Sequence, residues 1–212
     1  MTDTALLSLV QWLSPAFPTG GYAFSHGLEW AVWAGDVTTA AQLQVWIGAV
    51  LTEGAGRTDA ILLAQALRPD ADLPALAALA GALAASRERL TETLDQGRAL
   101  ATTVAALTGR DLAPMPYPVA LGAAARPLGL PVGRVVALYL HAFTSNLVQG
   151  GVRFVPLGQT EGQAVLAALH PLIDRMAAEA AEADLDRIGS GAFRSDLAAM
   201  RHETMDVRIF RT

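Results

Sequence analysis

Apolar residues recur along most of this chain with the spacing of an α-helix. Five positions fit the i, i+3, i+4, i+7, i+8 pattern of an amphipathic helix closely: Leu43, Trp46, Ile47, Val50 and Leu51. Similar spacing predicts four more buried faces: Leu6, Leu7, Val10 and Leu13; Leu76, Leu79 and Leu83; Leu90, Leu94, Ala101 and Val104; and Leu166, Leu169, Ile173 and Met176. The nearest candidate for a β-strand, residues 152–155, is short. The pattern therefore predicts an all-α fold.

Proline and glycine clusters divide the helical pattern into segments. One cluster lies at residues 15–21, after the first helix, and another at residues 114–118. Both predict breaks between helices, and no linker is long enough to separate independent domains. We therefore expect a single compact multi-helix domain of about eight to ten helices over residues 1–188. Gly-Ser-Gly at the start of residues 189–212 predicts a separate C-terminal interaction tail.

The composition narrows the possible functions. Hydrophobic residues make up 52% of the 212 residues and charged residues only 17%, below the usual share of about 25%. All 15 basic residues are Arg, so the chain has neither a Schiff-base lysine nor the lysine of a phosphate-binding loop. It also has no Cys, which excludes disulfides and thiolate metal sites and fits a cytoplasmic protein.

The charge pattern and the apolar stretches argue against two classes of partner. The net charge is −5 and the arginines are scattered, whereas a nucleic-acid-binding protein normally has a basic stripe. The purest apolar stretch, residues 73–85, has 13 residues and is too short to span a bilayer. No basic residue precedes Leu6, so we expect no secretory signal. We expect a cytoplasmic protein that binds neither nucleic acid nor a membrane.

The segment Ala23-Phe24-Ser25-His26-Gly27 resembles the nucleophile elbow of a hydrolase. That motif needs a strand, a sharp turn and a helix, but a proline- and glycine-rich turn precedes Ser25 here. Ser25 is better interpreted as an N-cap of the following helix. A helical serine-dependent hydrolase that uses Ser25 is the alternative function from the enzyme class.

The histidines give no firm metal site. His202 to Asp206 differs by one residue from a zincin motif, because Asp206 replaces the second His. His26, His141, His170 and His202 are far apart in sequence and form no ligand-spaced cluster. We therefore expect no cofactor.

The end of the chain has an unusual composition. Val207, Ile209 and Phe210 lie among arginines, and arginine next to an exposed aromatic residue is typical of an interface hot spot. The alternative is a tail that folds back on its own body. Arg153 likewise has two interpretations: it neutralises buried acceptors, or it faces a partner.

Three motifs in order resemble the UreF family of urease accessory proteins. The first is residues 14–29, which read Ser-Pro-Ala-Phe-Pro-Thr-Gly-Gly-Tyr-Ala-Phe-Ser-His-Gly-Leu-Glu. The second is Arg153 followed by Pro-Leu-Gly-Gln-Thr at 156–160. The third is Val-Arg-Ile-Phe at 207–210, where the family usually has Ser-Arg-Leu-Phe, a departure at two positions.

This resemblance implies an all-α, dimeric protein that is not an enzyme. It implies a scaffold that bridges UreD (also called UreH) and the GTPase UreG and supports nickel insertion into apo-urease. The resemblance and the tail composition together predict a partner-binding set: Arg153, Arg201, His202, Glu203, Arg208 and Phe210. His26 and Glu29 lie in the best-matched motif and are expected at most to line a transient nickel path. A generic helical adaptor without a link to urease is the remaining alternative.

Overall fold

The computed structural model of the chain describes residues 3–211, and this part is all-α, as expected. The first two residues of the predicted body and Thr212 of the predicted tail lie outside it. Within residues 3–211 the backbone forms no strand. The α-helices are α1 (Asp3–Leu13), α2 (Leu28–Trp33), α3 (Ala40–Glu53), α4 (Ala55–Ala66), α5 (Leu73–Ala82), α6 (Arg87–Thr108), α7 (Tyr117–Ala125), α8 (Val132–Phe154), α9 (Gln159–Glu182) and α10 (Phe193–His202). Three short 3-10 helices are η1 (Gly21–Ala23), η2 (Arg126–Leu128) and η3 (Leu185–Arg187).

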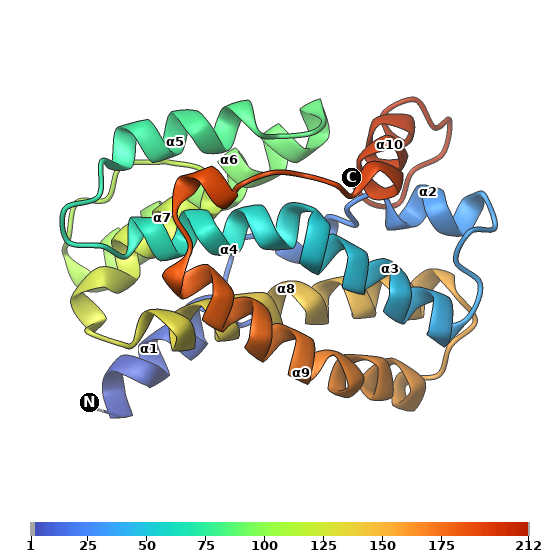
Figure 1. Cartoon of the computed structure of the whole chain (residues 1–212), viewed down its shortest axis with the longest axis horizontal. Helices are drawn as coiled ribbons and strands as arrows, with labels where there is room; N and C mark the ends of the chain where they lie inside the picture. Colours follow the sequence, from blue (N-terminus) through green and yellow to red (C-terminus); the bar gives the residue numbers. More distant parts are fainter. Residues whose placement is uncertain (1–2, 212) are drawn as a thin grey trace.

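Helix α4 lies at the centre of the molecule (Figure 1). Every residue from Asp59 to Ala66 is buried, because other helices pack around most of its circumference. The long helices α8 and α9 pack against each other and against α3 and α4, while α7 joins α4 to α6. Helix α10 packs against α2 and α6 at one end. None of the described helices combines the length and apolar character needed to cross a membrane.

The predicted faces of α3 and α9 are confirmed. All nine apolar positions predicted on these two helices are buried: Leu43, Trp46, Ile47, Val50, Leu51, Leu166, Leu169, Ile173 and Met176. Both helices use these faces to pack against each other. Thr39 begins α3 with a side-chain oxygen that accepts a hydrogen bond from the Gln42 amide, which is the usual role of an N-cap threonine.

The predicted face of α1 is wrong. Leu7 and Val10 are 66% and 48% exposed, and the helix instead buries Leu9 and Trp12. Apolar residues occupy both sides of α1, so spacing alone does not decide which side packs. The side with the large Trp12 ring is buried, because it removes more apolar area from water.

The predicted faces of α5 and α6 are partly wrong. Leu83 lies just beyond the end of α5 and Leu94 lies on α6, and both are 38% exposed. The first half of α6 instead buries Glu92, Thr93 and Gln96. A search for apolar spacing misses such a face, because its side chains are polar and can be buried only where they have polar partners.

Candidate partner-binding surface around the C-terminal segment

The C-terminal segment, residues 189–211, lies against the helical body (Figure 1). At its start, the amide of Gly191 donates to the carbonyl of Glu53 at the end of α3 (2.8 Å). At its end, the amide of Arg211 donates to the carbonyl of Ala23 (2.8 Å). In the described structure the segment is therefore folded back on the body, and its contact with a partner stays a prediction.

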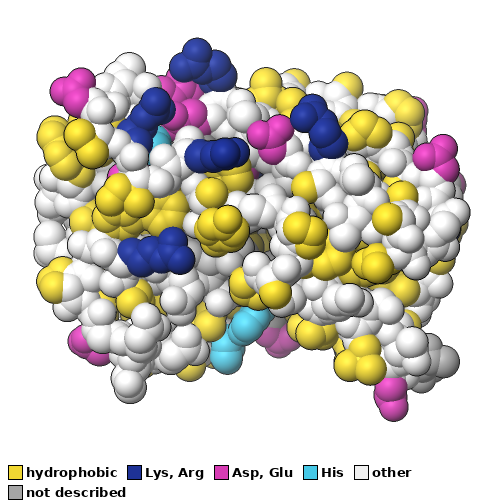
Figure 2. All heavy atoms as spheres, turned by 180° about the vertical axis from the view of Figure 1, so that it is seen from behind, with side chains coloured by type: hydrophobic (Ala, Val, Ile, Leu, Met, Phe, Trp, Pro, Cys, Tyr) yellow, Lys and Arg dark blue, Asp and Glu magenta, His cyan; other side chains and the backbone are white. Residues whose placement is uncertain are grey.

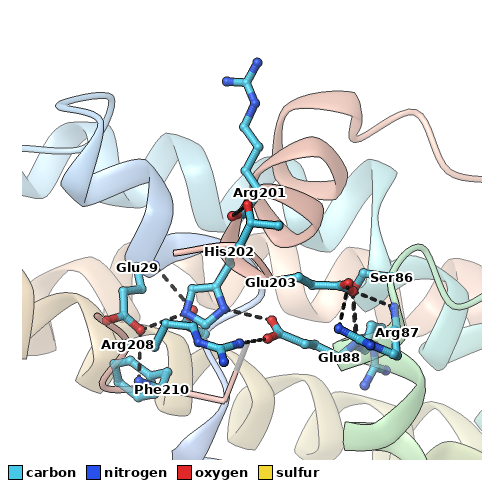
Figure 3. A network of polar contacts seen from close by, with 12 residues as sticks. Glu29, Ser86, Arg87, Glu88, Arg201, His202, Glu203, Arg208 and Phe210 are labelled. Carbon is cyan, nitrogen blue, oxygen red and sulfur yellow. Dashed lines mark hydrogen bonds and ion pairs between the residues drawn. The ribbon is translucent and has the colours of Figure 1, made fainter. Parts of the chain in front are cut away.

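His202, the last residue of α10, is fully buried between two carboxylates (Figure 3). Its Nδ1 lies 2.8 Å from Glu88 Oε2, and its Nε2 lies 2.9 Å from Glu29 Oε2. Both ring nitrogens of His202 are therefore paired with carboxylate oxygens, one from α6 and one from α2.

Glu29 holds the final turn of the chain against α2. It is 5% exposed, and its oxygens accept hydrogen bonds from the amides of Ile209 (2.8 Å) and Phe210 (2.9 Å) in addition to the contact with His202. A carboxylate with several charge-assisted hydrogen bonds is a strong attachment point. Residues 209 and 210 are thereby fixed to a helix about 180 residues earlier in the chain.

Glu88 completes this arrangement from α6. One of its oxygens accepts from Arg208 Nη1, and the other contacts His202. We call Glu29, Glu88, His202 and Arg208 the tail network. Two carboxylates face the ring of His202 and the guanidinium of Arg208, and the buried groups all have partners.

Glu203 stabilises the start of α6. Its Oε1 accepts hydrogen bonds from the amides of Arg87 (2.8 Å) and Glu88 (3.3 Å). These amides belong to the first turn, where helix N–H groups have no partner within the helix and favour a negative charge. Glu203 thus joins the C-terminal segment to α6, in addition to the tail network.

Gly27 allows α10 to pack directly on the loop before α2. Its φ is +74°, and a Cβ atom here would lie 2.6 Å from the amide nitrogen of Ala199 and 2.8 Å from the carbonyl oxygen of Ser195. Any side chain would both strain the backbone and push α10 away. The glycine of the N-terminal motif is therefore required for the position of the C-terminal helix.

Ser25 is buried and does not have the environment of a hydrolase nucleophile. Its Oγ accepts a hydrogen bond from the amide of Glu29 (3.3 Å), so it caps the first turn of α2, although Gly27 is the N-cap residue itself. A nucleophile elbow needs a strand before the serine, and none occurs in residues 3–211. The elbow interpretation of this segment is wrong.

The outer side of the C-terminal segment exposes arginines and apolar side chains. Arg201 and Arg153 are exposed, with their guanidinium carbons 5.7 Å from the Trp30 ring centre and 6.0 Å from the Phe210 ring centre. Arg153 therefore lies at the surface beside the buried Phe210, and its contact with a partner stays a prediction. A groove of about 560 Å³, here called the tail groove, is lined mainly by Trp30, Trp33, Phe154, Val207 and Ile209. Figure 2 shows hydrophobic and Arg side chains interspersed on this part of the surface.

The structure therefore divides the predicted partner-binding residues into two groups. His202, Glu203 and Phe210 are buried or half-buried and attach the segment to the body. Arg153, Arg201 and Arg208 keep much of their surface exposed around the tail groove. The first group sets the shape of the surface, and the second group is available for contact.

A second polar cluster lies deeper, and we call it the core polar cluster. His26 Nε2 lies 3.2 Å from Glu92 Oε1, Arg89 Nη1 lies 3.1 Å from Glu92 Oε2, and Arg89 also bonds Asp59. Tyr139 donates its hydroxyl to Asp59 (2.7 Å). Cavities of about 60 and 40 Å³, each lined by the four charged members, adjoin this cluster.

Burial and neighbouring charges shift the pKa values of Glu92, Arg89 and Tyr139 in the core polar cluster. Burial alone would raise the pKa of Glu92, but His26 and Arg89 outweigh it and lower that pKa from 4.5 to about 2. Burial opposes the charge of Arg89 as well, but Asp59 and Glu92 raise its pKa well above the ordinary value. Burial followed by the nearby Asp59 raises the pKa of Tyr139, which stays neutral.

His26 and Glu29, predicted together on a nickel path, lie in different networks. His26 belongs to the core polar cluster and packs edge-on against Phe143, with ring centres 4.7 Å apart. Glu29 belongs to the tail network. Among the residues described, no group of three or more His, Asp or Glu side chains is placed to hold a metal ion.

Several residues of both networks were missing from the sequence predictions. The sequence gives Glu88, Arg89 and Glu92 no distinguishing signal, because mixed charges on a helix usually face solvent. Asp59 gave no signal either. The nearest sequence signal was Ser86, whose Oγ accepts from the Arg89 amide (3.0 Å) and marks the start of α6.

Comparison with known sequences gives consistent matches. A sequence model of the UreF family matches residues 37–170. A urease accessory protein UreF from Cereibacter sphaeroides (strain KD131) is 71% identical over 210 residues, which covers 99% of this chain and all of the relative. Proteins of the same name from Dinoroseobacter shibae (56% identical over 98% of this chain and 99% of the relative) and Paracoccus denitrificans (50% over 99% and 97%) also match. The full-length matches include the N-terminal motif and the tail, which lie outside residues 37–170.

Proposed function

Because the chain belongs to the UreF family of urease accessory proteins, with a role in urease maturation, we propose that it is the scaffold that bridges UreD (UreH) and the GTPase UreG. In this role it supports nickel insertion into apo-urease without holding the nucleotide itself. The absence of any lysine agrees with this division, since a phosphate-binding loop needs one. The proposal assigns the nucleotide chemistry to the partner.

The observation that carries the proposal is the tail groove with its exposed arginines. Trp33, Val207 and Ile209 are 70%, 76% and 74% exposed, which is unusual for side chains of this size. Arginine and aromatic residues around an apolar groove have the composition of a binding hot spot. Since Glu29 fixes the backbone of residues 209 and 210, the groove is already ordered before a partner binds, which lowers the entropic cost of association.

We assign the tail groove to UreG. Of the exposed arginines, Arg201 and Arg153 contact only aromatic rings in the described structure, so both guanidinium groups can donate hydrogen bonds to carboxylates of a partner. This assignment predicts an acidic complement on the GTPase.

The test uses co-purification of the full chain with UreD and UreG. The double variant Val207→Ser, Ile209→Ser removes two exposed apolar side chains of the groove but keeps the amide of residue 209 that bonds Glu29. We expect it to lose UreG while retaining UreD and its helical circular dichroism spectrum. Arg201→Ala should weaken UreG binding by about tenfold or more, as expected for a hot-spot residue.

A matched control changes an exposed apolar residue elsewhere. Leu107, near the end of α6, is 57% exposed, and Leu107→Ser should leave UreG binding unchanged. If the groove variant binds UreG as tightly as the Leu107→Ser control, the assignment of the groove is wrong. If the wild-type chain binds neither UreD nor UreG, the scaffold proposal itself is wrong.

The nickel path is a separate part of the proposal. His26 and Glu29 could each offer a weak, exchangeable ligand to a passing ion, but nickel would have to displace Glu92 from one or the tail amides from the other. The His26→Ala, Glu29→Ala double variant tests this by urease activation. Normal activation would remove both residues from the path.

We also propose that the chain acts as a homodimer in the cytoplasm. Multi-angle light scattering of the purified chain at micromolar concentration tests the dimer. A mass equal to one chain of 22.2 kDa at all concentrations would contradict it.

A further inference from the structure

The structure brings together two histidines that lie far apart in sequence. His141 on α8 and His170 on α9 are both exposed, and their ring centres are 5.4 Å apart. The four histidines form no ligand-spaced cluster in the sequence, but the fold places these two side by side. Figure 2 shows histidine side chains on this face of the molecule. The other two histidines are buried against carboxylates.

The separation of the rings suits a shared metal ion. A metal–nitrogen bond is about 2 Å long, so two imidazoles on one tetrahedral ion hold their ring centres about 5 Å apart. The observed 5.4 Å is close to that separation without any movement of the helices. Helices α8 and α9 pack along much of their length, so the backbone positions of the pair are fixed in advance.

The environment also favours neutral imidazole, which is the form that binds metal. Burial on one side and the neighbouring His170 both lower the pKa of His141. Within residues 3–211, no carboxylate, amide or hydroxyl group forms a hydrogen bond or an ion pair with either ring. The pair has no structural task comparable to those of His26 and His202.

We propose that His141 and His170 together bind one divalent transition-metal ion, such as Ni²⁺ or Zn²⁺, on the outer side of the α8–α9 hairpin. The remaining coordination positions face solvent, because no third His, Asp or Glu in the described chain is placed to complete the site. An ion held by two protein ligands stays exchangeable. The site shares no residue with the tail groove and does not depend on the scaffold proposal.

Metal titration of the purified chain tests the site directly. The chain has four histidines and no cysteine, so competing nitrogen and sulfur ligands are few once affinity tags are removed. Isothermal titration calorimetry with Ni²⁺ or Zn²⁺ at pH 7.5 should show one ion per chain, with Cu²⁺ tighter than Ni²⁺ and no binding of Mg²⁺. His141→Ala and His170→Ala should each weaken binding by about a hundredfold, because the second imidazole binds as an intramolecular ligand.

A second measurement locates the ion. The four histidine ring signals can be followed by NMR, and Zn²⁺ should shift those of residues 141 and 170 while the two buried rings stay unchanged. Gln163→Ala, a change at another exposed position on α9, serves as the control and should keep full affinity. Saturable binding that persists in the His141→Ala, His170→Ala variant, or wild-type protein that binds neither Ni²⁺ nor Zn²⁺, would overturn the proposal.

Discussion

Replacement of His202 by Gln should release the C-terminal segment while most of the fold survives. Gln is similar in length but has one side-chain nitrogen in place of two, so it cannot contact Glu29 and Glu88 at the same time as His202 does. Breaking a buried ion pair costs about 3–5 kcal/mol. The lower end applies, because the Arg208 side chain is 41% exposed and the remaining charges are partly screened.

The segment can open on its own, so this cost should appear as local opening rather than as global unfolding. A loss of about 3 kcal/mol raises the open population on the order of a hundredfold. Trypsin reports this directly. The chain has no lysine, so its 15 arginines are the only sites, and cleavage after Arg201 requires exposure of the buried His202. Where reclosing is fast, the cleavage rate follows the open population.

The control is His141→Gln, the same chemical change at an exposed histidine. Intact mass spectrometry should show release of residues 202–212 on the order of a hundred times faster in His202→Gln than in this control. Hydrogen exchange at the amides of Ile209 and Phe210, which donate to Glu29, should accelerate in parallel. If both variants are cleaved after Arg201 at rates within about twofold of each other, the His202 side chain does not hold the segment closed.

Three further changes test the interior. The pKa of Glu92 is lowered from 4.5 to about 2, so the stability that its carboxylate provides is present above pH 4.5 and is lost as the pH falls toward 2. In urea unfolding, the free energy of unfolding of Glu92→Gln should therefore depend less on pH in that window than that of the wild type. Gly27→Ala should destabilise the fold more than Gly20→Ala, because both have φ +74° but only Gly27 is in close contact with α10; thermal melts of the two variants measure the difference. Tyr139→Phe removes the hydroxyl that donates to Asp59 and should cost about 1–3 kcal/mol in chemical denaturation, whereas no loss would mean that water replaces the bond.

How far the sequence predicted the fold depended on which groups each helix buries. The faces of α3 and α9 were predicted correctly because their buried positions are all apolar. The first half of α6 was not, because Glu92 and Gln96 are buried beside each other with a hydrogen bond of 2.9 Å between them. Periodicity detects apolar side chains that leave water, but it cannot detect polar side chains that are buried together with a hydrogen-bond partner.

The same limit applies to the candidate site. The tail composition and the N-terminal motif both indicated functional segments. Nothing in the sequence indicated that Glu29 and His202, which are 173 residues apart, are in contact. Glu88, the other carboxylate on His202, lies on α6 but outside the apolar face that was predicted for this helix. Pairing between distant charged residues depends on the packing of helices, which one sequence with many similar helices does not specify.

The N-terminal motif matters because its backbone changes direction within five residues. His26 (φ 52°) and Gly27 (φ 74°) both have left-handed backbone conformations, and this turn sends His26 toward Glu92 while Glu29 faces the tail. Both networks then meet α6 within its first two turns, at Glu88 for the tail network and at Glu92 for the core polar cluster. A partner that pulls Arg208 from Glu88 therefore changes the charge balance one helical turn from the buried cluster. The tail network and the core polar cluster are thus connected through adjacent turns of α6. A double-mutant cycle between Arg208 and Glu92 would measure the free energy of coupling between them.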